Sequence, residues 1–283
     1  MRALLLFVLV LFAAAAAQAQ APEGRLKKIA ESKAISIAYR ADAVPFSYVN
    51  DKGQPDGFAI DLCKRVVNSI ERQLNAPGLK VNWVPVTVQT RFEAVAKGRA
   101  DMECGSSTMT LARMKEVDFS SITFVESTGL LVKADSGLRS LSDMSGKKIA
   151  VVAGTTNEGA INLQLKRRQM NASVLPFKSR DEAFAAFEEG KADAFASDKL
   201  LLVGTQFKDA QSFRMLPDDL SVEPYAIALP HGDWQMRLAV NTALAELYRT
   251  GAVLKIFDQW FGRLGLRPGL LLGAAYTLGA LAD

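Results

Sequence analysis

The chain has 283 residues, of which 49% are hydrophobic and 23% charged, so it can bury the core of one large domain or two modest ones. One His and two Cys exclude the common zinc sites, and neither a metal nor a cofactor is expected. The formal charge of +4 comes from 34 basic residues that are scattered rather than run together, so no nucleic-acid partner is expected.

The first segment has the pattern of a secretion signal. Met1-Arg2 gives a positive start, the stretch from Ala3 to Ala17 is apolar throughout, and Ala17-Gln18-Ala19 fits the small-x-small cleavage rule. The apolar stretch is shorter than the roughly 20 residues that span a bilayer. We therefore expect residues 1–20 to be a cleaved signal peptide and the mature protein to be periplasmic.

Segments typical of strands and of helices alternate after this leader. The first series is a strand at 35–39, a helix at 59–74, a strand at 81–84, a helix at 90–97 and a strand at 100–104. The second is a strand at 149–152, a helix at 156–170, a strand at 173–177, a helix at 181–189 and a strand at 192–196, and helices at 234–248 and 252–261 follow. This alternation predicts parallel α/β layers. The apolar tail, 269–282, is too short to span a membrane and is expected to dock on the body.

The two series resemble each other. Six residues recur at a constant offset of 92: Phe92, Ala94, Gly98, Arg99, Ala100 and Asp101 match Phe184, Ala186, Gly190, Lys191, Ala192 and Asp193. Any helix-glycine-strand unit could give such a match, but a true repeat makes Ser106 equivalent to Asp198. A second match near offset 114 sets Ile35 and Ile37 on Ile149 and Val151. Ligands of open α/β sheets bind beyond the carboxyl ends of strands, so two facing halves predict a cleft lined by both.

Polar residues follow these strand ends. Arg40, Arg91 and Arg113 favour a small molecule with several anionic groups, because a guanidinium pairs with a carboxylate through two parallel hydrogen bonds. Thr155 and Thr156 open the helix at 156–170, and a helix start with free N–H groups can bind a carboxylate. Plain helix capping is the alternative interpretation of these two threonines.

Six segments occur together in one order along the chain. They are Val44-Pro45-Phe46-Ser47-Tyr48, Gly57 to Leu62, Glu103 to Thr108 with Arg113, Phe119-Ser120, Gly154-Thr155-Thr156 and Ser197-Asp198. Together, over about residues 26–262, they resemble the periplasmic polar-amino-acid-binding proteins of ABC importers, and the Glu-Cys-Gly-Ser run resembles the glutamate/aspartate branch.

This resemblance implies an α/β, two-lobed periplasmic binding protein fold (type II), with doubly wound sheets and a ligand cleft between the lobes. Lobe 1 would comprise residues 21–128 plus 222–283, and lobe 2 residues 129–221. Two crossing strands, near 129–132 and 224–229, would form the hinge.

The resemblance also implies roles for single residues. Arg113, helped by Thr108, Thr155 and Thr156, would bind the α-carboxylate; Asp198 and Ser106 would bind the α-ammonium; Arg40 and Arg91 would face the side-chain carboxylate. Two positions depart from the branch, which commonly has Ser in place of Val88 and His in place of Arg180. Arg180 either adds a positive charge to the site or points to solvent.

The expected function is capture of glutamate or aspartate by a monomer that delivers it to an ABC permease in the inner membrane. An exported dehydratase acting on cyclohexadienyl acids, or a sensory subunit that docks a receptor, resembles the same fold. Strand alternation leaves open whether Glu103 faces the ligand. Asp198 favours a binding protein over an enzyme, because an amino-acid ammonium requires it and no second acid is expected beside it.

The two cysteines allow two outcomes. Cys63 on the first helix and Cys104 at a strand end could form a disulfide in an oxidising compartment, and two buried thiols are the alternative.

Overall fold

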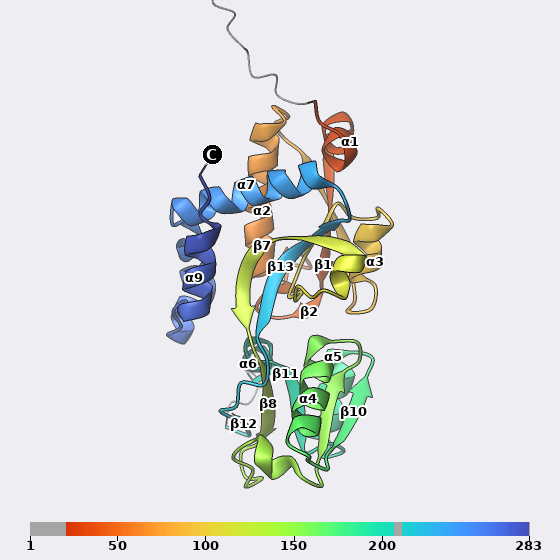
Figure 1. The fold of residues 1–283 in the computed structure, drawn as a ribbon, viewed down its shortest axis with the longest axis vertical. Coiled ribbons are helices and arrows are strands. Elements are labelled where there is room, and N and C mark those ends of the chain that lie inside the picture. Colours follow the sequence, from red (N-terminus) through yellow and green to blue (C-terminus); the bar gives the residue numbers. More distant parts are fainter. Residues whose placement is uncertain (1–20, 207–210, 283) are drawn as a thin grey trace, which may run out of the picture.

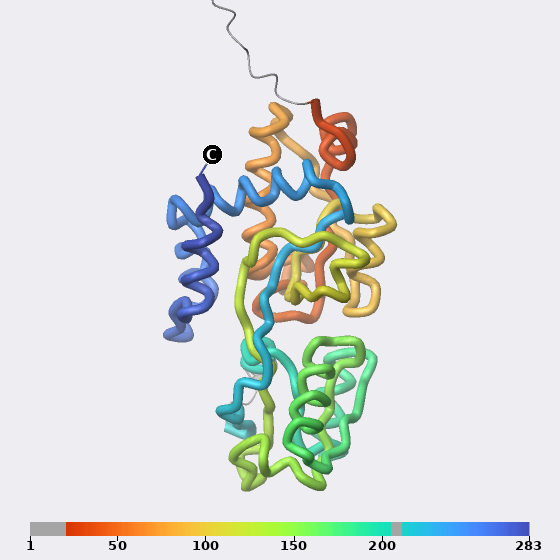
Figure 2. Tube along the Cα trace, in the orientation of Figure 1, coloured from red at the N-terminus to blue at the C-terminus, as the bar shows by residue number. Residues whose placement is uncertain are grey.

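Two five-stranded sheets, each with its own helices, lie one beyond the other along the long axis of the molecule (Figure 1). The computed structural model describes residues 21–206 and 211–282, so the expected signal peptide at 1–20 lies outside the described residues. Figure 2 shows the chain crossing between the two sheets twice, once in each direction.

The first sheet carries the segments near both ends of the chain. Its strands in spatial order are β5 (Lys80–Val86), β1 (Ala34–Arg40), β6 (Met102–Cys104), β13 (Glu223–Pro230) and β7 (Val117–Glu126). Its helices are α1 (Gly24–Ser32), α2 (Phe58–Gln73), α3 (Arg91–Ala96), α7 (Trp234–Arg249), α8 (Ala252–Phe261) and α9 (Leu270–Gly279), with short 3-10 turns η1 (Arg113–Lys115) and η3 (Gly262–Leu264). A small sheet of β2 (Asp42–Ala43), β3 (Ser47–Val49) and β4 (Pro55–Asp56) lies beside it. We call this part the first unit.

The second sheet is formed by the middle of the chain. Its strands in spatial order are β10 (Ser173–Phe177), β9 (Lys148–Val152), β11 (Ala194–Asp198), β8 (Thr128–Lys133) and β12 (Phe213–Met215). Its helices are α4 (Thr156–Arg167), α5 (Arg180–Glu188) and α6 (Lys199–Gln206), with a 3-10 turn η2 (Leu141–Met144). We call this part the second unit.

Both sheets are mixed, which corrects the expectation of parallel layers. β1 runs parallel to β5 and β6, and β9 runs parallel to β10 and β11. The crossing strands β13 and β8, together with the edge strands β7 and β12, pair antiparallel. The chain enters and leaves each unit through these strands, so it adds an antiparallel edge to an otherwise parallel sheet.

The internal repeat is visible as matching hydrogen bonds. The Ser36 amide donates to Asp101 Oδ2 over 2.7 Å, and the Lys148 amide donates to Asp193 Oδ2 over 2.8 Å. The reverse backbone bonds, from each aspartate amide to the carbonyl of Ser36 or Lys148, are 2.7 and 2.8 Å long. Asp101 and Asp193 keep the offset of 92, whereas Ser36 and Lys148 differ by 112. The match near offset 114 is therefore wrong by two residues, because periodicity alone does not fix the register of a short strand.

The first unit is held by a core that joins distant parts of the chain. The rings of Phe46, Phe58, Phe124 and Phe261 pack on one another, with centroids 4.9 to 6.2 Å apart. Cys63 and Cys104 are joined by a disulfide between α2 and the end of β6. That bond ties the helix to the strand whose end carries Ser106.

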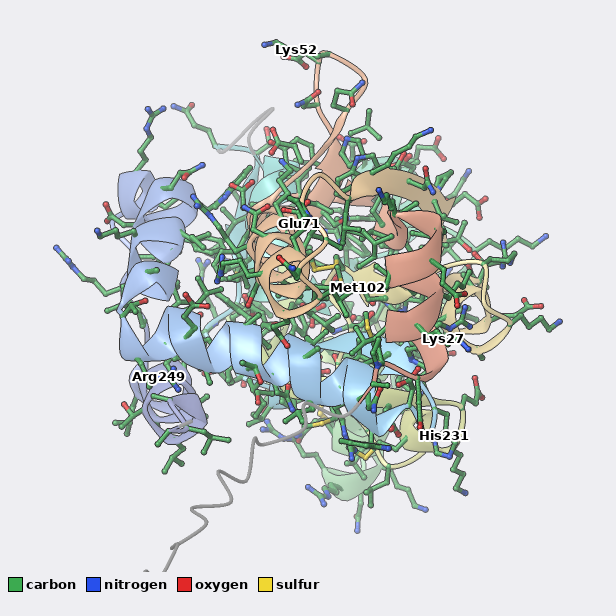
Figure 3. The ribbon with its side chains drawn as sticks, turned by 90° about the horizontal axis from the view of Figure 1, so that it is seen from above. Lys27, Lys52, Glu71, Met102, His231 and Arg249 are labelled. Atoms are coloured by element: carbon green, nitrogen blue, oxygen red, sulfur yellow. A yellow bond between two sulfur atoms is a disulfide. The ribbon has the colours of Figure 1, made fainter. Side chains whose placement is uncertain are left out.

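The C-terminal tail packs on the body as a helix. Leu272 and Tyr276 of α9 are buried, and the Tyr276 hydroxyl donates to the Thr123 carbonyl of β7 over 3.0 Å. Figure 3, a view from above, shows Arg249 at the end of α7, where the C-terminal helices lie. Within residues 21–206 and 211–282, no helix is both long enough and apolar enough to cross a bilayer.

Candidate functional site

A small pocket lies between the two units, at the strand ends that the repeat marks. Its lining from the first unit is Arg40, Asp42, Val88, Arg91, Ser106 and Thr108. Its lining from the second unit is Val152, Thr155, Thr156, Asn157, Arg180, Ser197, Asp198 and Leu201. Eight of the nine candidate residues therefore meet at one pocket, whose free cavity is about 30 Å³.

Arg113 is the candidate that does not line this pocket. It begins the turn η1, and its Nη1 donates to the Thr108 carbonyl over 2.7 Å. Its guanidinium carbon lies 5.1 Å from the centroid of the Phe92 ring. Burial lowers the pKa of Arg113, while the charges of Glu223, Glu103 and Asp198 oppose that shift. Arg113 thus lies outside the pocket and contacts Thr108, which lines it.

Asp198, the last residue of β11, is buried at the pocket wall. Asn157, in the first turn of α4, donates from its Nδ2 to Asp198 Oδ1 over 2.9 Å and to the Thr128 hydroxyl over 2.8 Å. Burial, followed by the charge of Glu223, raises the pKa of Asp198 to about 6. The carboxylate is therefore costly to ionise here, and a bound cation would stabilise its charged form.

Two further acids lie close to Asp198, so the expectation that it has no acidic neighbour is wrong. Glu223 is buried on β13, and its carboxylate accepts hydrogen bonds from Thr108 (2.7 Å), Ser221 (2.6 Å) and Thr128 (3.4 Å). Glu126, at the end of β7, has a pKa raised to about 8 by burial and by the charge of Asp198. These acids come from β13 and β7, which the repeat does not include.

The threonine hydroxyls are largely engaged in local structure. Thr155 caps α4: its Oγ1 accepts from the Glu158 amide over 3.3 Å and donates to the Val152 carbonyl over 2.7 Å. The Thr108 hydroxyl donates to Glu223 and lies 3.3 Å from the Thr156 hydroxyl of the other unit. Capping, the alternative interpretation, thus accounts for the Thr155 side chain.

Arg91 is buried at the start of α3, next to the pocket. Its guanidinium carbon lies 4.8 Å from the centroid of the Phe92 ring, and its Nε has no hydrogen-bond partner among the described residues. Burial lowers the pKa of Arg91 to about 9, and the charge of Glu103 opposes that shift. Glu103 is itself fully buried on β6 and does not line the pocket. Burial raises the pKa of Glu103, and the charge of Arg91 is the largest influence against that rise.

Arg180 points inward rather than to solvent. Its Nη1 donates to the Ser197 hydroxyl over 2.7 Å, its Nη2 donates to the Leu201 carbonyl, and its guanidinium carbon lies 5.2 Å from the Phe195 ring centroid. Burial lowers the pKa of Arg180 to about 10, with the charges of Asp198 and Asp42 opposing. Of the two alternatives for Arg180, the structure has the buried positive charge.

Several pocket residues lie outside the sequence-based set of candidates. Asp42 binds Arg40 with both carboxylate oxygens, and a signal was available: residues i and i+2 of an extended segment share a face. Asn157 follows the Thr155-Thr156 pair but gives no separate signal. Among residues 21–206 and 211–282, no group of three His, Cys, Asp or Glu side chains is arranged to hold a metal ion.

Residues 35–263 match the family model of the bacterial extracellular solute-binding proteins, family 3. The match covers most of the chain, and the chain belongs to this family. Its architecture is the two-lobed α/β fold that the sequence predicts.

Individual relatives narrow the comparison. The L-glutamate/L-aspartate-binding protein of Pseudomonas aeruginosa is 36% identical over 246 residues, which cover 84% of this chain and 80% of that protein. The glutamate/aspartate import solute-binding protein of Escherichia coli K12 is 31% identical, over 86% and 81% of the two chains.

Among solved structures, the ancestral amino acid-binding protein AncCDT-1, a precursor of cyclohexadienyl dehydratase, matches with a TM-score of 0.73 and 30% identity over 84% of this chain and all of that one. An ancestral arginine-binding protein bound to glutamine matches with a TM-score of 0.72 and 28% identity, over 81% of this chain and 98% of that one.

Proposed function

We propose that this protein captures an acidic amino acid, glutamate or aspartate, in the pocket between its two units. The observation that carries the proposal is the charge of the pocket. Three arginines, Arg40, Arg91 and Arg180, line it with two aspartates, Asp42 and Asp198. The lining therefore carries a net charge of +1, which complements the net charge of −1 on a zwitterionic acidic amino acid.

Each group of such a ligand has a partner of suitable chemistry. Asp198 pairs with the α-ammonium, beside Ser106. The α-carboxylate binds near Thr108 and the start of α4, with Arg113 supporting Thr108 from behind. The arginines of the lining, Arg40, Arg91 and Arg180, bind the side-chain carboxylate. The names of the relatives from Pseudomonas aeruginosa and Escherichia coli support this ligand class.

We place the protein in the periplasm, as the partner of an ABC permease in the inner membrane, and expect it to act as a monomer. Support comes from the secretion pattern of residues 1–20, the extracellular description of the family and the word import in the name of the Escherichia coli relative. The moving parts would be lobe 1, residues 21–128 plus 222–283, and lobe 2, residues 129–221. A sensory subunit would share the same pocket, and neighbouring permease and ATPase genes would favour import.

We further propose that the protein is a binding protein without enzymatic activity. A dehydratase needs a general acid that reaches the substrate. The two acids that line the pocket are Asp42, which is bound to Arg40, and Asp198, which is assigned to the α-ammonium. Glu103 is fully buried and does not line the pocket, and the Glu223 carboxylate is engaged by three hydroxyl groups. Incubation with a cyclohexadienyl acid, followed by product analysis, tests this point, and turnover above background would contradict it.

Ligand-dependent melting tests the proposed specificity. A ligand at a thousand times its Kd adds about 4 kcal/mol to the folded state, so glutamate or aspartate should raise the Tm by several degrees. Mature protein is melted with acidic, amide, basic and apolar amino acids, and the hits are titrated by calorimetry. A shift with a basic or apolar amino acid and none with either acid would overturn the proposal.

A further inference from the structure

Arg40 already has a carboxylate bound along one edge of its guanidinium. Its Nε donates to Asp42 Oδ1 and its Nη2 donates to Asp42 Oδ2, each over 2.8 Å. Two parallel hydrogen bonds of this kind are the geometry in which arginine binds a ligand carboxylate. Asp42 therefore occupies the edge of Arg40 that a ligand would otherwise use.

The surrounding strands hold this pair in place. Arg40 ends β1 and Asp42 begins β2, which pairs with β3 in the small sheet. The Ser47 hydroxyl of β3 lies 3.0 Å from both the amide and the carbonyl of Arg40 and bonds to each. The Arg40 side chain is 6% exposed and that of Asp42 is 31% exposed, so the pair is shielded but open to the pocket.

The pair changes what Arg40 offers to a ligand. Among the described residues, Arg40 Nη1 has no hydrogen-bond partner, so one nitrogen remains for the ligand while the positive charge is balanced by Asp42. A ligand carboxylate there is attracted by Arg40 and repelled by Asp42. A side-chain amide carries no charge and does not meet that repulsion.

Arg180, which lines the pocket from the second unit, also interacts with the Asp42 carboxylate through its charge. Although burial raises the pKa of Asp42, the hydrogen bonds and charge of Arg40 and then the charge of Arg180 bring it below its usual value. Asp42 thus draws on two of the three pocket arginines and remains ionised.

We propose that Asp42 is a specificity-determining residue that reduces the preference of the pocket for a side-chain carboxylate over a side-chain amide. The pocket then binds amide amino acids as well as acidic ones. This inference rests on the proposed function and deepens it. It concerns the ratio of two affinities, whereas the proposed function concerns whether an acidic amino acid binds.

Calorimetry with glutamate and glutamine tests the inference on wild type and Asp42→Asn. Asn has the shape of Asp without its charge, so Asp42→Asn should bind glutamate about tenfold more tightly and glutamine within about threefold of wild type. Asp42→Ser, a smaller change, is measured beside it in case an unbalanced Arg40 impairs folding. Asp42→Glu returns the charge and should bring the ratio back toward wild type.

A matched control removes a negative charge elsewhere in the same small sheet. Asp51 is exposed in the turn between β3 and β4, and Figure 3 shows its neighbour Lys52 at a tip that projects away from the body. Asp51→Asn should leave the ratio unchanged. If the ratio of glutamate affinity to glutamine affinity is unchanged in Asp42→Asn and Asp42→Ser, the inference is overturned but the proposed function stands. If the ratio falls, the inference is also overturned, and Asp42 instead orients Arg40 for the ligand. Failure of wild type to bind either ligand would remove the proposed function as well.

Discussion

The Glu-Cys-Gly-Ser run shows how four adjacent residues divide several tasks. Glu103 is a buried acid whose pKa is raised by burial, with the charge of Arg91 the largest opposing influence. Cys104 is bonded to Cys63, and Ser106 lines the pocket. A Cβ at Gly105 would meet a carboxylate oxygen of Glu103, so a larger residue there would require that side chain to shift. The run thus contributes Ser106 to the pocket wall and ties β6 to α2 through Cys104.

The proposed pairing of Asp198 with the ligand predicts that binding depends on pH. In the proposed complex its charged form pairs with the α-ammonium, and its pKa of about 6 means that acidification removes that charge. Protonation below that pKa leaves the ammonium unpaired, so the affinity for glutamate should fall about tenfold between about pH 7 and about pH 5. Both carboxylates of the ligand stay largely ionised over this range. Calorimetric titrations at several pH values measure the dependence.

Two variants assign this dependence to its source. Asp198→Asn should bind weakly and show little change over the same range. Glu126→Gln removes another buried carboxyl with a raised pKa but keeps Asp198, so it should retain the dependence. An affinity of wild type that stays constant down to about pH 5 would show that Asp198 does not pair with the ligand.

Among the secondary-structure elements, α9 covers one edge of the first sheet. β7 is the edge strand of the first sheet, and α9 packs against it through Leu272 and Tyr276. The Tyr276 ring lies 4.9 Å from the Tyr248 ring of α7, between centroids. An uncovered edge strand is prone to pair with other chains, so this helix protects the sheet as well as stabilising it. The family match ends at residue 263, before α9 begins.

Substitutions on the two faces of α9 separate packing from helix propensity. Tyr276→Ala empties a buried site and removes the bond to Thr123, so it should lower the free energy of unfolding by about 3 kcal/mol. Leu278, on the same helix, is 78% exposed. Leu278→Ala should change the free energy of unfolding by less than about 0.5 kcal/mol. Urea denaturation monitored by circular dichroism gives both values. Equal effects would mean that α9 does not pack on β7 in solution.

At the scale of the whole molecule, the two units touch around the pocket. The Thr108 and Thr156 hydroxyls lie 3.3 Å apart, and Gln89 Nε2 donates to the Lys178 carbonyl over 3.0 Å. A cavity of about 30 Å³ holds little more than one or two water molecules. We therefore expect the units to move apart when an amino acid enters or leaves, with the two crossing segments of the chain absorbing the motion.

Gly204 offers a test of this closure at a position that does not line the pocket. It lies on α6, and a Cβ at this position would be 2.6 Å from the Val44 carbonyl oxygen of the first unit. Gly204→Ala should hinder closure and weaken every ligand by about tenfold, because it disfavours the state that binds. Gly159→Ala on α4, where a Cβ meets nothing within 4 Å, is the control and should bind normally. Calorimetry compares the variants.

Small-angle scattering follows the same motion directly. The radius of gyration of wild type should decrease when a saturating ligand is added, and the decrease should be smaller for Gly204→Ala. An unchanged profile at saturation would argue that the pocket is already closed in the absence of ligand.

Local patterns in the sequence predicted the strands and helices of the two alternating series, because apolar periodicity and glycine and proline boundaries are local; they did not predict β2, β3, β4, β7 or β12. β10 and α8 have the expected bounds, and the repeat aligned the strand ends so that Ser106 and Asp198 were selected together. Position after a strand end selected Arg40 and Arg91, both of which line the pocket. Capping of α4 by Thr155 is equally local, and the sequence offers it as the alternative to carboxylate binding.

Which charges meet depends on contacts between distant segments of the chain. Glu223 reaches Asp198 because β13 crosses back between the units, and no local pattern reports a contact between segments so far apart. The inward orientation of Arg180 depends on Leu201 of another helix, and the register of the first strands depends on pairing rather than on periodicity. Asp42 lies within two residues of Arg40, yet their pairing depends on the small sheet that holds the chain at this turn. Burial then sets the energetic weight of each charge, and burial is a property of the assembled units, because it depends on what the rest of the chain places around a residue.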